Sequence, residues 1–249
     1  MRVKSTSAPR QSLYGLSINT LDRASLFSLV DARMAEGLVT SINFLNAHCF
    51  NVAQKDKRYR AALENCTVLL NDGVGVDIAG KLAGVSFPEN MNGTDLIPEF
   101  FSYARDHGLA VYCMGSTDEV IERAARIFER DYPDLTLAGY SNGFFDNSDE
   151  VVTRINASGA DMLVLGMGVP LQEIWTDEHL AQLYSVRLCI CGGAIFDFVS
   201  GNVMRAPPLV RRLKMEWLFR LAQEPRRLFS RYVLGSFVFL YNIIARRKT

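Results

Sequence analysis

Most of the 249-residue chain repeats one arrangement: a short apolar run, a small or polar residue, then an amphipathic segment with helical spacing. Alternating strand and helix patterns predict a mostly parallel β-sheet with helices on both faces, which is a Rossmann-like α/β fold. Thr20, Thr94 and Ser116 are expected to cap three of the helices. The expected strands are 41–45, 67–70, 109–114, 135–138, 161–165 and 187–190, and the expected helices are 21–36, 49–64, 74–83, 95–107, 117–131, 148–157 and 171–184.

Small and polar residues follow these expected strands. The carboxyl ends of parallel strands meet at one edge of a sheet, and this is the edge where open α/β sheets bind ligands. Glycine there lets a ligand approach the backbone, and the helix N-termini that follow present free N–H groups to anions. Each residue alone is compatible with a simple turn, including the Asp-Gly pair. As a set they predict a phosphate-bearing ligand; they are Asn46, Asp72, Gly73, Gly115, Ser116, Gly166, Gly168, Gly192 and Gly193.

Common phosphate-binding motifs do not fit the chain. Segments 73–78 and 166–171 each lack the third glycine of the dinucleotide fingerprint, which argues against a nicotinamide dehydrogenase. The chain also lacks a Walker A lysine and any Asp-x-Asp motif. A nucleotide-sugar transferase without that metal clamp would need cationic side chains and helix dipoles to hold the leaving group.

Positive charge is concentrated at the C-terminal end. Residues 205–249 hold 11 Lys/Arg and 2 Asp/Glu, a net charge of +9. The remainder holds 16 basic and 25 acidic residues, a net charge of −9. We therefore expect an α/β catalytic domain at 1–204 and a basic, amphipathic helical appendage at 205–249, with helices over 207–223 and 225–245. Such an appendage suits an anionic partner: a membrane surface, a phosphate or a nucleic acid. Aromatic and basic residues do not interleave there, which argues against nucleic acid.

The longest uncharged apolar run, 232–245, would extend about 21 Å as a helix, which is less than the bilayer core of about 30 Å. Residues 1–12 are polar and basic, so no signal peptide is expected. The five cysteines lack paired metal-binding spacing, which favours buried free thiols in a reducing compartment. The three histidines also lack such spacing, so no metal site is expected. No cofactor is expected either.

Several segments match, in order, the signatures of one family. They cover the strand-end residues, an Asn-Gly-Thr-Asp-Leu segment, a Gly-x-Gly-x-Pro-x-Gln-Glu segment and a Cys-Gly-Gly-Ala segment. From about residue 13 to residue 232 the chain resembles the WecG/TagA/CpsF glycosyltransferases. The matching residues and segments are Asn46, 72–73, 92–96, 111–115, 166–175, 191–198, Gly201, 205–207, 216–221 and 224–227.

This resemblance implies a bacterial enzyme of cell-surface polymer or exopolysaccharide synthesis. It would take a UDP-sugar donor and extend a sugar carried on a polyprenyl diphosphate, inverting the anomeric centre without a metal. It would act as a peripheral protein on the cytoplasmic face of the inner membrane. Relatives transfer N-acetylmannosamine, its uronic acid or glucose, so the sugar stays open, as does the oligomeric state, with a homo-oligomer possible.

The resemblance also assigns roles to individual residues. Asp72 corresponds to the general base and Asn46 to the strand-end asparagine that binds a sugar hydroxyl or orients Asp72. Pro170 to Gln172 correspond to the donor pocket, and Gln172 could instead lie on a solvated helix face. The C-terminal arginines of the family correspond to Arg220, Arg227 and Arg231. The remaining residues expected to bind substrate are Gly73, Asn92, Gly115, Ser116, Gly168 and Gly193.

The chain departs from the family at Phe44, Asn90 and Ser230, where relatives often carry Thr, Arg and Arg. These changes affect the expected sugar contacts rather than the reaction type. Asp197 is the second choice for the base, and Glu173 is another rival carboxylate.

Alternative functions also remain open. The chain could be a non-catalytic protein that binds anionic lipid through its basic appendage, or an NAD-containing epimerase or dehydrogenase. The second helix of the appendage could pack on the core with a solvated basic face, or lie on a membrane with its arginines closing over the donor diphosphate.

Overall fold

The structure of the protein is a computed structural model, of which residues 7–213 and 215–246 are described. Its centre is a six-stranded, all-parallel sheet of order β4-β3-β8-β7-β5-β6, which confirms the Rossmann-like α/β fold. Five strands are buried along their whole length, and only the edge strand β6 is partly exposed. The strands are β3 (Thr40–Leu45), β4 (Val68–Asn71), β5 (Val111–Gly115), β6 (Leu137–Ser141), β7 (Met162–Gly166) and β8 (Leu188–Cys191).

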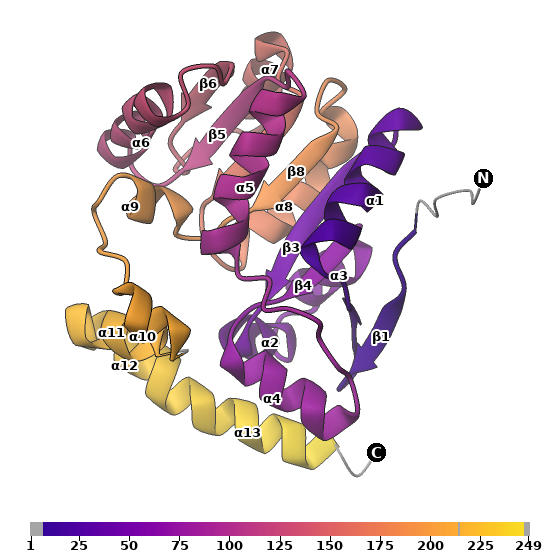
Figure 1. Ribbon diagram of the computed structural model, residues 1–249, viewed down its shortest axis with the longest axis vertical. Helices are drawn as coiled ribbons and strands as arrows, with labels where there is room; N and C mark the ends of the chain where they lie inside the picture. The colour runs from indigo at the N-terminus through magenta and orange to yellow at the C-terminus, as the bar shows by residue number, and fades with distance from the viewer. Residues whose placement is uncertain (1–6, 214, 247–249) are drawn as a thin grey trace.

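Helices cover both faces of the sheet, as expected, because successive strand side chains point to opposite faces. One core cluster joins the face carrying Ile42 and Val164 to α1, α5, α6 and α9. Two further clusters join the other face, which carries Leu69 and Leu163, to α2, α3, α7 and α8. Figure 1 shows α1 and α5 crossing in front of strands that have α8 behind them. The helices are α1 (Arg23–Ala35), α2 (Ala47–Ala53), α3 (Lys57–Asn65), α4 (Val74–Ala83), α5 (Gly93–Asp106), α6 (Asp118–Asp131), α7 (Ser148–Ser158), α8 (Leu171–His179) and α9 (Ile195–Val199).

An N-terminal hairpin was not expected from the sequence. Strands β1 (Arg10–Leu13) and β2 (Leu16–Asn19) pair antiparallel around Tyr14 and Gly15, which both have positive φ. A two-residue turn with positive φ and a glycine is a recognised hairpin connection, so Tyr14-Gly15 was the available signal. The side chain of Asn19 accepts a hydrogen bond from the backbone of Leu69 at 2.9 Å, which fastens the hairpin beside β4.

Three expected helix caps are wrong. Asp22 and Asn92, rather than Thr20 and Thr94, cap α1 and α5. Each accepts a hydrogen bond from the backbone N–H three residues later, at 2.8 and 2.9 Å. Both caps have extended backbone, the conformation that aims a side-chain oxygen at the first helical turn. Ser116 has φ +54° in the turn after β5, so α6 starts later and no capping box forms.

Two expected helices are divided. The segment 49–64 forms α2 and α3, because Asp56 caps a new helix by accepting hydrogen bonds from Arg58 and Tyr59. The expected helix over 207–223 is two short helices, α10 (Pro208–Arg212) and α11 (Glu216–Gln223). The five cysteines are free and buried, as expected.

We call residues 205–246 the tail; positions 247–249 of the expected appendage lie outside the described residues. After α10 and α11, the tail forms one long helix from α12 (Pro225–Phe229) through a π-helical segment (Ser230–Leu234) to α13 (Gly235–Arg246). Figure 1 shows this helix running along one end of the molecule beside α4 and α2. The 22-residue helix Pro225–Arg246 is long and apolar enough to cross a membrane by length and composition alone. This corrects the expectation from the uncharged run 232–245.

Candidate active site

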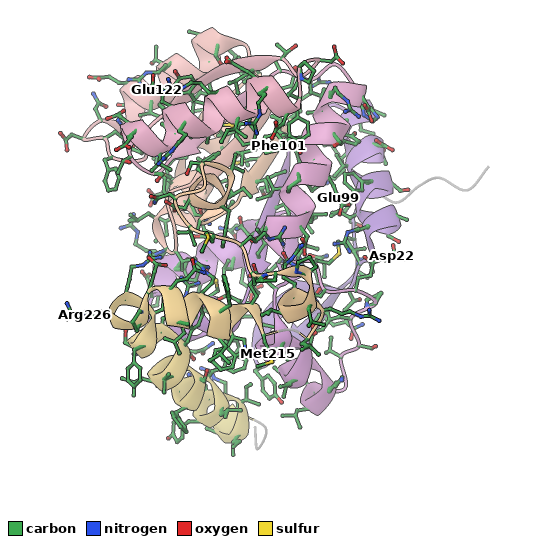
Figure 2. All side chains as sticks on the ribbon, turned by 60° about the vertical axis from the view of Figure 1, so that its left-hand side comes forward. Asp22, Glu99, Phe101, Glu122, Met215 and Arg226 are labelled. Carbon is green, nitrogen blue, oxygen red and sulfur yellow. The ribbon has the colours of Figure 1, made fainter. Side chains whose placement is uncertain are left out.

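A cleft of about 460 Å³ lies where the carboxyl ends of β3 and β4 meet the start of α5 and the tail. Figure 2 shows side chains between the tail and the rest of the molecule around Met215, with Arg226 on the outer side of the tail. Residues far apart in sequence therefore share one site. The cleft is lined by Asn46, Ala47, His48, Asp72, Gly73, Val74, Gly75, Ile78, Asn90, Asn92, Thr94, Asp95, Phe198, Arg211, Glu216, Trp217, Arg220, Arg231, Tyr232, Ser236, Phe239 and Leu240.

Asp72 and Asn46 lie side by side because β3 and β4 are neighbours in parallel register, with Leu45 opposite Asn71. The Asn46 Nδ2 donates to Asp72 Oδ2 at 3.2 Å. The Asn46 Oδ1 accepts from the backbone of Cys49 at 3.0 Å and so caps α2. Because Oδ1 is used in this cap, the Nδ2 of Asn46 is the end of the amide that points to Asp72. Asn46 therefore orients the carboxylate of Asp72.

Burial in the cleft raises the pKa of the Asp72 carboxyl, because its charged form loses solvation. The hydrogen bond from Asn46 and the charges of Arg231 and Arg220 partly oppose this shift, while Glu216 adds to it. A carboxylate with a raised pKa is a stronger base, and the open cleft leaves room for a substrate hydroxyl beside it.

The tail brings Arg220 and Arg231 to the same cleft. The guanidinium of Arg220 stacks over the ring of Phe198, with Cζ 4.9 Å from the ring centroid. Within the part of the chain that the structure describes, the buried Nε atoms of both arginines lack a hydrogen-bond partner. Both side chains are thus poised to bind an anion. Arg227 pairs with Glu224 instead and is not among the lining residues.

Gly73 and Asn92 line the cleft, but their polar groups are engaged. The backbone N–H of Gly73 donates to Asn90 Oδ1 at 3.0 Å, and its φ of +82° suits glycine. Asn92 donates to Asp95 Oδ2 at 2.7 Å in addition to capping α5. Asn90, where relatives often carry Arg, therefore holds the loop after Asp72 through its hydrogen bond with Gly73. The departure at Phe44 is buried against Gly93.

The other predicted residues form a second group at the ends of β5, β7 and β8, outside the lining of the cleft. Gln172 is 2% exposed; its Oε1 accepts from the backbone of Gly168 at 3.3 Å and of Gly193 at 3.0 Å. Gln172 therefore joins two strand-end loops and does not lie on a solvated helix face. The expected contact of Gln172 with the donor stays a prediction. Its Oε1 would have to give up the hydrogen bonds from Gly168 and Gly193 to make that contact. The group comprises Gly115, Ser116, Gly168, Pro170, Gln172 and Gly193.

Neither rival carboxylate, Glu173 or Asp197, is among the residues that line the cleft. Glu173 is 2% exposed; burial raises its pKa to about 7, and its Oε1 accepts from Gln172 Nε2 at 2.8 Å. Asp197 accepts from Asn202 Nδ2 at 3.0 Å. Of the three carboxylates considered as the base, Asp72 is therefore the one that lines the cleft with Arg220 and Arg231.

Sequence reasoning missed five charged or titratable residues of the cleft: His48, Asp95, Arg211, Glu216 and Tyr232. Burial, and then the charge of Arg231, lower the pKa of His48 to about 4, so the imidazole is neutral near pH 7. Its place two residues after Asn46, at the first turn of α2, was the only available signal. Glu216 and Arg211 could not be placed without knowing where the tail docks. Among the described residues, no three His, Cys, Asp or Glu side chains gather as metal ligands would.

Comparison with known proteins identifies relatives along most of the chain. Residues 11–249 match the profile described as the glycosyl transferase WecG/TagA/CpsF family. A Bacillus spizizenii protein named N-acetylglucosaminyldiphosphoundecaprenol N-acetyl-beta-D-mannosaminyltransferase is 33% identical over 70% of this chain and 68% of its own. Proteins with the same name from Bacillus subtilis and Staphylococcus aureus are each 30% identical. They cover 75% and 82% of this chain and 72% and 79% of their own.

Proposed function

The chain belongs to the WecG/TagA/CpsF family of glycosyl transferases, and on this premise we propose that it transfers a sugar from a UDP-sugar to a polyprenyl-diphosphate-linked sugar. The names of its relatives favour N-acetylmannosamine as the transferred sugar and N-acetylglucosamine as the acceptor sugar. The product would serve cell-surface polymer synthesis. The reaction would invert the anomeric centre.

One observation carries this proposal: a raised-pKa carboxylate from the sheet and two arginines from the tail line one cleft. Glycosyl transfer by direct displacement needs a base for the acceptor hydroxyl and positive charge for the departing diphosphate. Asp72 supplies the first need, and Arg220 and Arg231 supply the second.

In the proposed step, the acceptor hydroxyl attacks C1 of the donor sugar while its proton moves to the Asp72 carboxylate. The new O–C1 bond forms as the bond from C1 to the diphosphate oxygen breaks, and UDP leaves with that electron pair. Attack from the side opposite UDP inverts C1. Asn46 keeps Asp72 oriented through the 3.2 Å hydrogen bond. Both arginines offset the charge that develops on UDP.

The surface of the tail supports work at a membrane. Phe237, Tyr241 and Ile244 of the long helix are more than 60% exposed, and cationic residues flank this apolar surface. A basic helix with exposed aromatic residues suits the interface of an anionic membrane. We propose that the protein binds the cytoplasmic face of the inner membrane peripherally, where a polyprenyl diphosphate would present its sugar to the cleft.

UDP release is the test of this function. Purified protein is mixed with UDP-N-acetylmannosamine and N-acetylglucosaminyl-diphosphofarnesol, and UDP is measured over time. We expect release that depends on both substrates and that Asp72→Asn reduces by orders of magnitude while UDP binding persists. Release at the normal rate from Asp72→Asn would reject Asp72 as the base.

The exposed apolar surface of the tail also favours a second candidate, a lipid-binding protein without chemistry. That candidate predicts salt-sensitive vesicle binding and no UDP release with the N-acetylmannosamine, N-acetylmannosaminuronate or glucose donor. Release with any of the three would exclude it.

A further inference from the structure

Gln172 and Glu173 are consecutive polar residues in the first turn of α8, and both side chains are only 2% exposed. Gln172 joins the loops after β7 and β8, because its Oε1 accepts from the backbone N–H groups of Gly168 and Gly193. Its Nε2 donates to Glu173 Oε1 at 2.8 Å. The two loops and the acid are therefore connected through one amide group.

The hydrogen bond to Glu173 determines which way round the Gln172 amide lies. A glutamine amide has a donor end and an acceptor end, and turning it over exchanges them. With the donor end on the carboxyl of Glu173, the acceptor end faces the two backbone N–H groups. In the reverse orientation, an NH₂ group would face two N–H donors, and a carbonyl oxygen would face the acceptor Glu173 Oε1. The carboxyl of Glu173 thus selects the orientation that holds both loops.

Glu173 also lines a cavity of about 60 Å³ between β3, α3 and α8. Its Oε2 and the Oδ1 of Asn43, which lines the same cavity, are buried acceptors without a hydrogen-bond partner among the described residues. The described lining includes Asp177 but no Lys, Arg or His. A carboxylate is poorly stabilised in such a place, whereas a proton on Oε2 supplies a donor where acceptors are in excess. The neutral acid therefore suits the cavity and leaves Oε1 to accept from Gln172.

The loop after β8 connects this hydrogen-bond network to the cleft. It runs from Gly193 directly into α9, whose Phe198 lines the cleft and lies under the guanidinium of Arg220. At Gly168 and Gly193 an added Cβ would meet no other described heavy atom within 4 Å. Both loops therefore border open space at the ligand-binding edge of the sheet. Their position affects the shape of the cleft beside Arg220.

We propose that Glu173 is a positioning residue for the donor side of the cleft: its carboxylic acid holds the amide of Gln172, which holds the loops after β7 and β8. This assignment rests on the proposed function. Glu173 needs no contact with a substrate in this role. Its effect reaches the donor only through Gln172, and this requirement distinguishes the assignment from a general contribution of Glu173 to the core.

The first test is a double-mutant cycle between the two residues. Glu173→Leu removes the acceptor but keeps a side chain of similar size, and Gln172→Leu removes the amide. UDP affinity, measured by calorimetry, and kcat and KM for UDP-N-acetylmannosamine are compared in the two single variants and the double variant. Glu178→Leu, at a half-exposed acid of the same helix, is the matched control.

We expect Glu173→Leu to weaken UDP binding and to raise KM for the donor by about three- to tenfold, the value of one hydrogen bond. The change in kcat should be smaller. In the protein that already carries Gln172→Leu, the same substitution should have no further effect. Glu178→Leu should leave all three quantities unchanged. Losses that add in the double variant, or a loss confined to kcat, would overturn the assignment.

A reversed pair tests the same contact without an apolar substitution in the core. Gln172→Glu alone sets two carboxyl groups against each other, so UDP affinity should fall. Adding Glu173→Gln returns a donor to the pair, and the new carboxylate can still accept from Gly168 and Gly193. We expect this double variant to recover most of the affinity, and Glu173→Gln alone to keep it. A double variant that binds UDP no better than Gln172→Glu would overturn the assignment.

Failure of the proposed function is recognised separately, because UDP release would then be absent in the unaltered protein. Amide hydrogen exchange of Gly168 and Gly193, followed by NMR, requires neither substrate nor turnover. Exchange that becomes equally faster in Glu173→Leu and Gln172→Leu, but not in Glu178→Leu, supports the assignment. Unchanged exchange in Glu173→Leu overturns it, whatever reaction the enzyme performs.

Discussion

The body of the molecule (residues 7–204) and the tail use apolar residues in opposite ways. In the body, five strands are buried along their whole length between helices on both faces. In the tail, α10 and α11 contain no buried residue, and the long helix buries only Leu228, Phe239 and Ile243. The body thus has a core of its own, whereas the tail leaves its apolar surface available to something else.

Specific contacts hold the tail against the body. Asn51 of α2 donates to the backbone oxygen of Gly235 at 2.7 Å and accepts from Asn242 at 3.2 Å. The ring of Phe239 meets Phe50 edge-on, with centroids 5.3 Å apart. Contacts with the body therefore determine where the tail lies. The α/β fold is therefore formed by the body, whereas the proposed reaction needs residues from the body and from the tail.

The largest expected effect comes from removing the tail. A chain ending at residue 204 keeps the strands and the three core clusters apart from Phe239 and Ile243, so a cooperative thermal transition should survive. It loses Arg220 and Arg231, so UDP release should fall below detection. Circular dichroism melting and the UDP-release assay check the two halves of this prediction. Full activity in the shortened chain would show that the tail is not part of the site.

The next effect belongs to the base in the body. Asp72→Asn keeps the size of the side chain but cannot accept the proton, so we expect kcat to fall by about 10²–10⁴-fold. UDP affinity, measured by calorimetry, should change little. Asp197→Asn serves as the control and should keep most of the activity; if it loses as much as Asp72→Asn, the choice between the two carboxylates is wrong.

A smaller effect is expected within the tail itself. Arg231→Ala removes one charge-assisted contact to the departing diphosphate, so UDP affinity and kcat/KM should fall by about 10- to 100-fold. Arg226→Ala removes an exposed arginine that is not among the cleft residues and should change neither. If UDP affinity and kcat/KM fell equally in the two variants, the tail would act only through its overall positive charge and not through a contact of Arg231.

A buried acid in the body should make stability depend on pH. Burial raises the pKa of Glu173 to about 7 from an ordinary 4.5, so the folded state holds this proton more tightly than the unfolded state does. Its contribution is therefore fully present below pH 4.5 and is lost as pH rises through 7, by about 3 kcal/mol in all. Urea unfolding of Glu173→Gln should show a flatter pH dependence than the unaltered protein. Glu178→Gln, a half-exposed acid of the same helix, should retain the original slope.

The smallest effect concerns the outer surface of the tail. Phe237 and Tyr241 are 69% and 72% exposed, so changing both to Ser should leave thermal stability unchanged. Binding to vesicles that contain anionic lipid should weaken by about tenfold, because apolar area is no longer inserted. Tyr184→Ser, on the body and 82% exposed, is the control. Unaltered vesicle binding in the double variant would argue for another membrane contact.

Much of the body could be predicted from sequence, because hydrophobic periodicity and turn residues determine its strands and helices locally. The strands end in polar or glycine residues, and parallel pairing then places Asn46 beside Asp72. Local patterns misplaced the caps at Thr20 and Thr94, since which oxygen meets the helix depends on the backbone before it. Residue patterns alone could not choose between the two positions considered for the tail, because its position depends on contacts such as Asn51 with Gly235 between distant segments.

The most direct test of the central claim, that base and tail arginines form one site, is the pH dependence of kcat/KM. Activity should fall as pH drops through the raised pKa of Asp72. Arg231 lowers that pKa and Glu216 raises it. Arg231→Ala should therefore move the acidic limb to higher pH and Glu216→Gln to lower pH, and both shifts should persist when His48 is changed to Gln. Opposite shifts in these two tail variants would establish that the tail lies against the base. An acidic limb that stays in place in both would contradict the account.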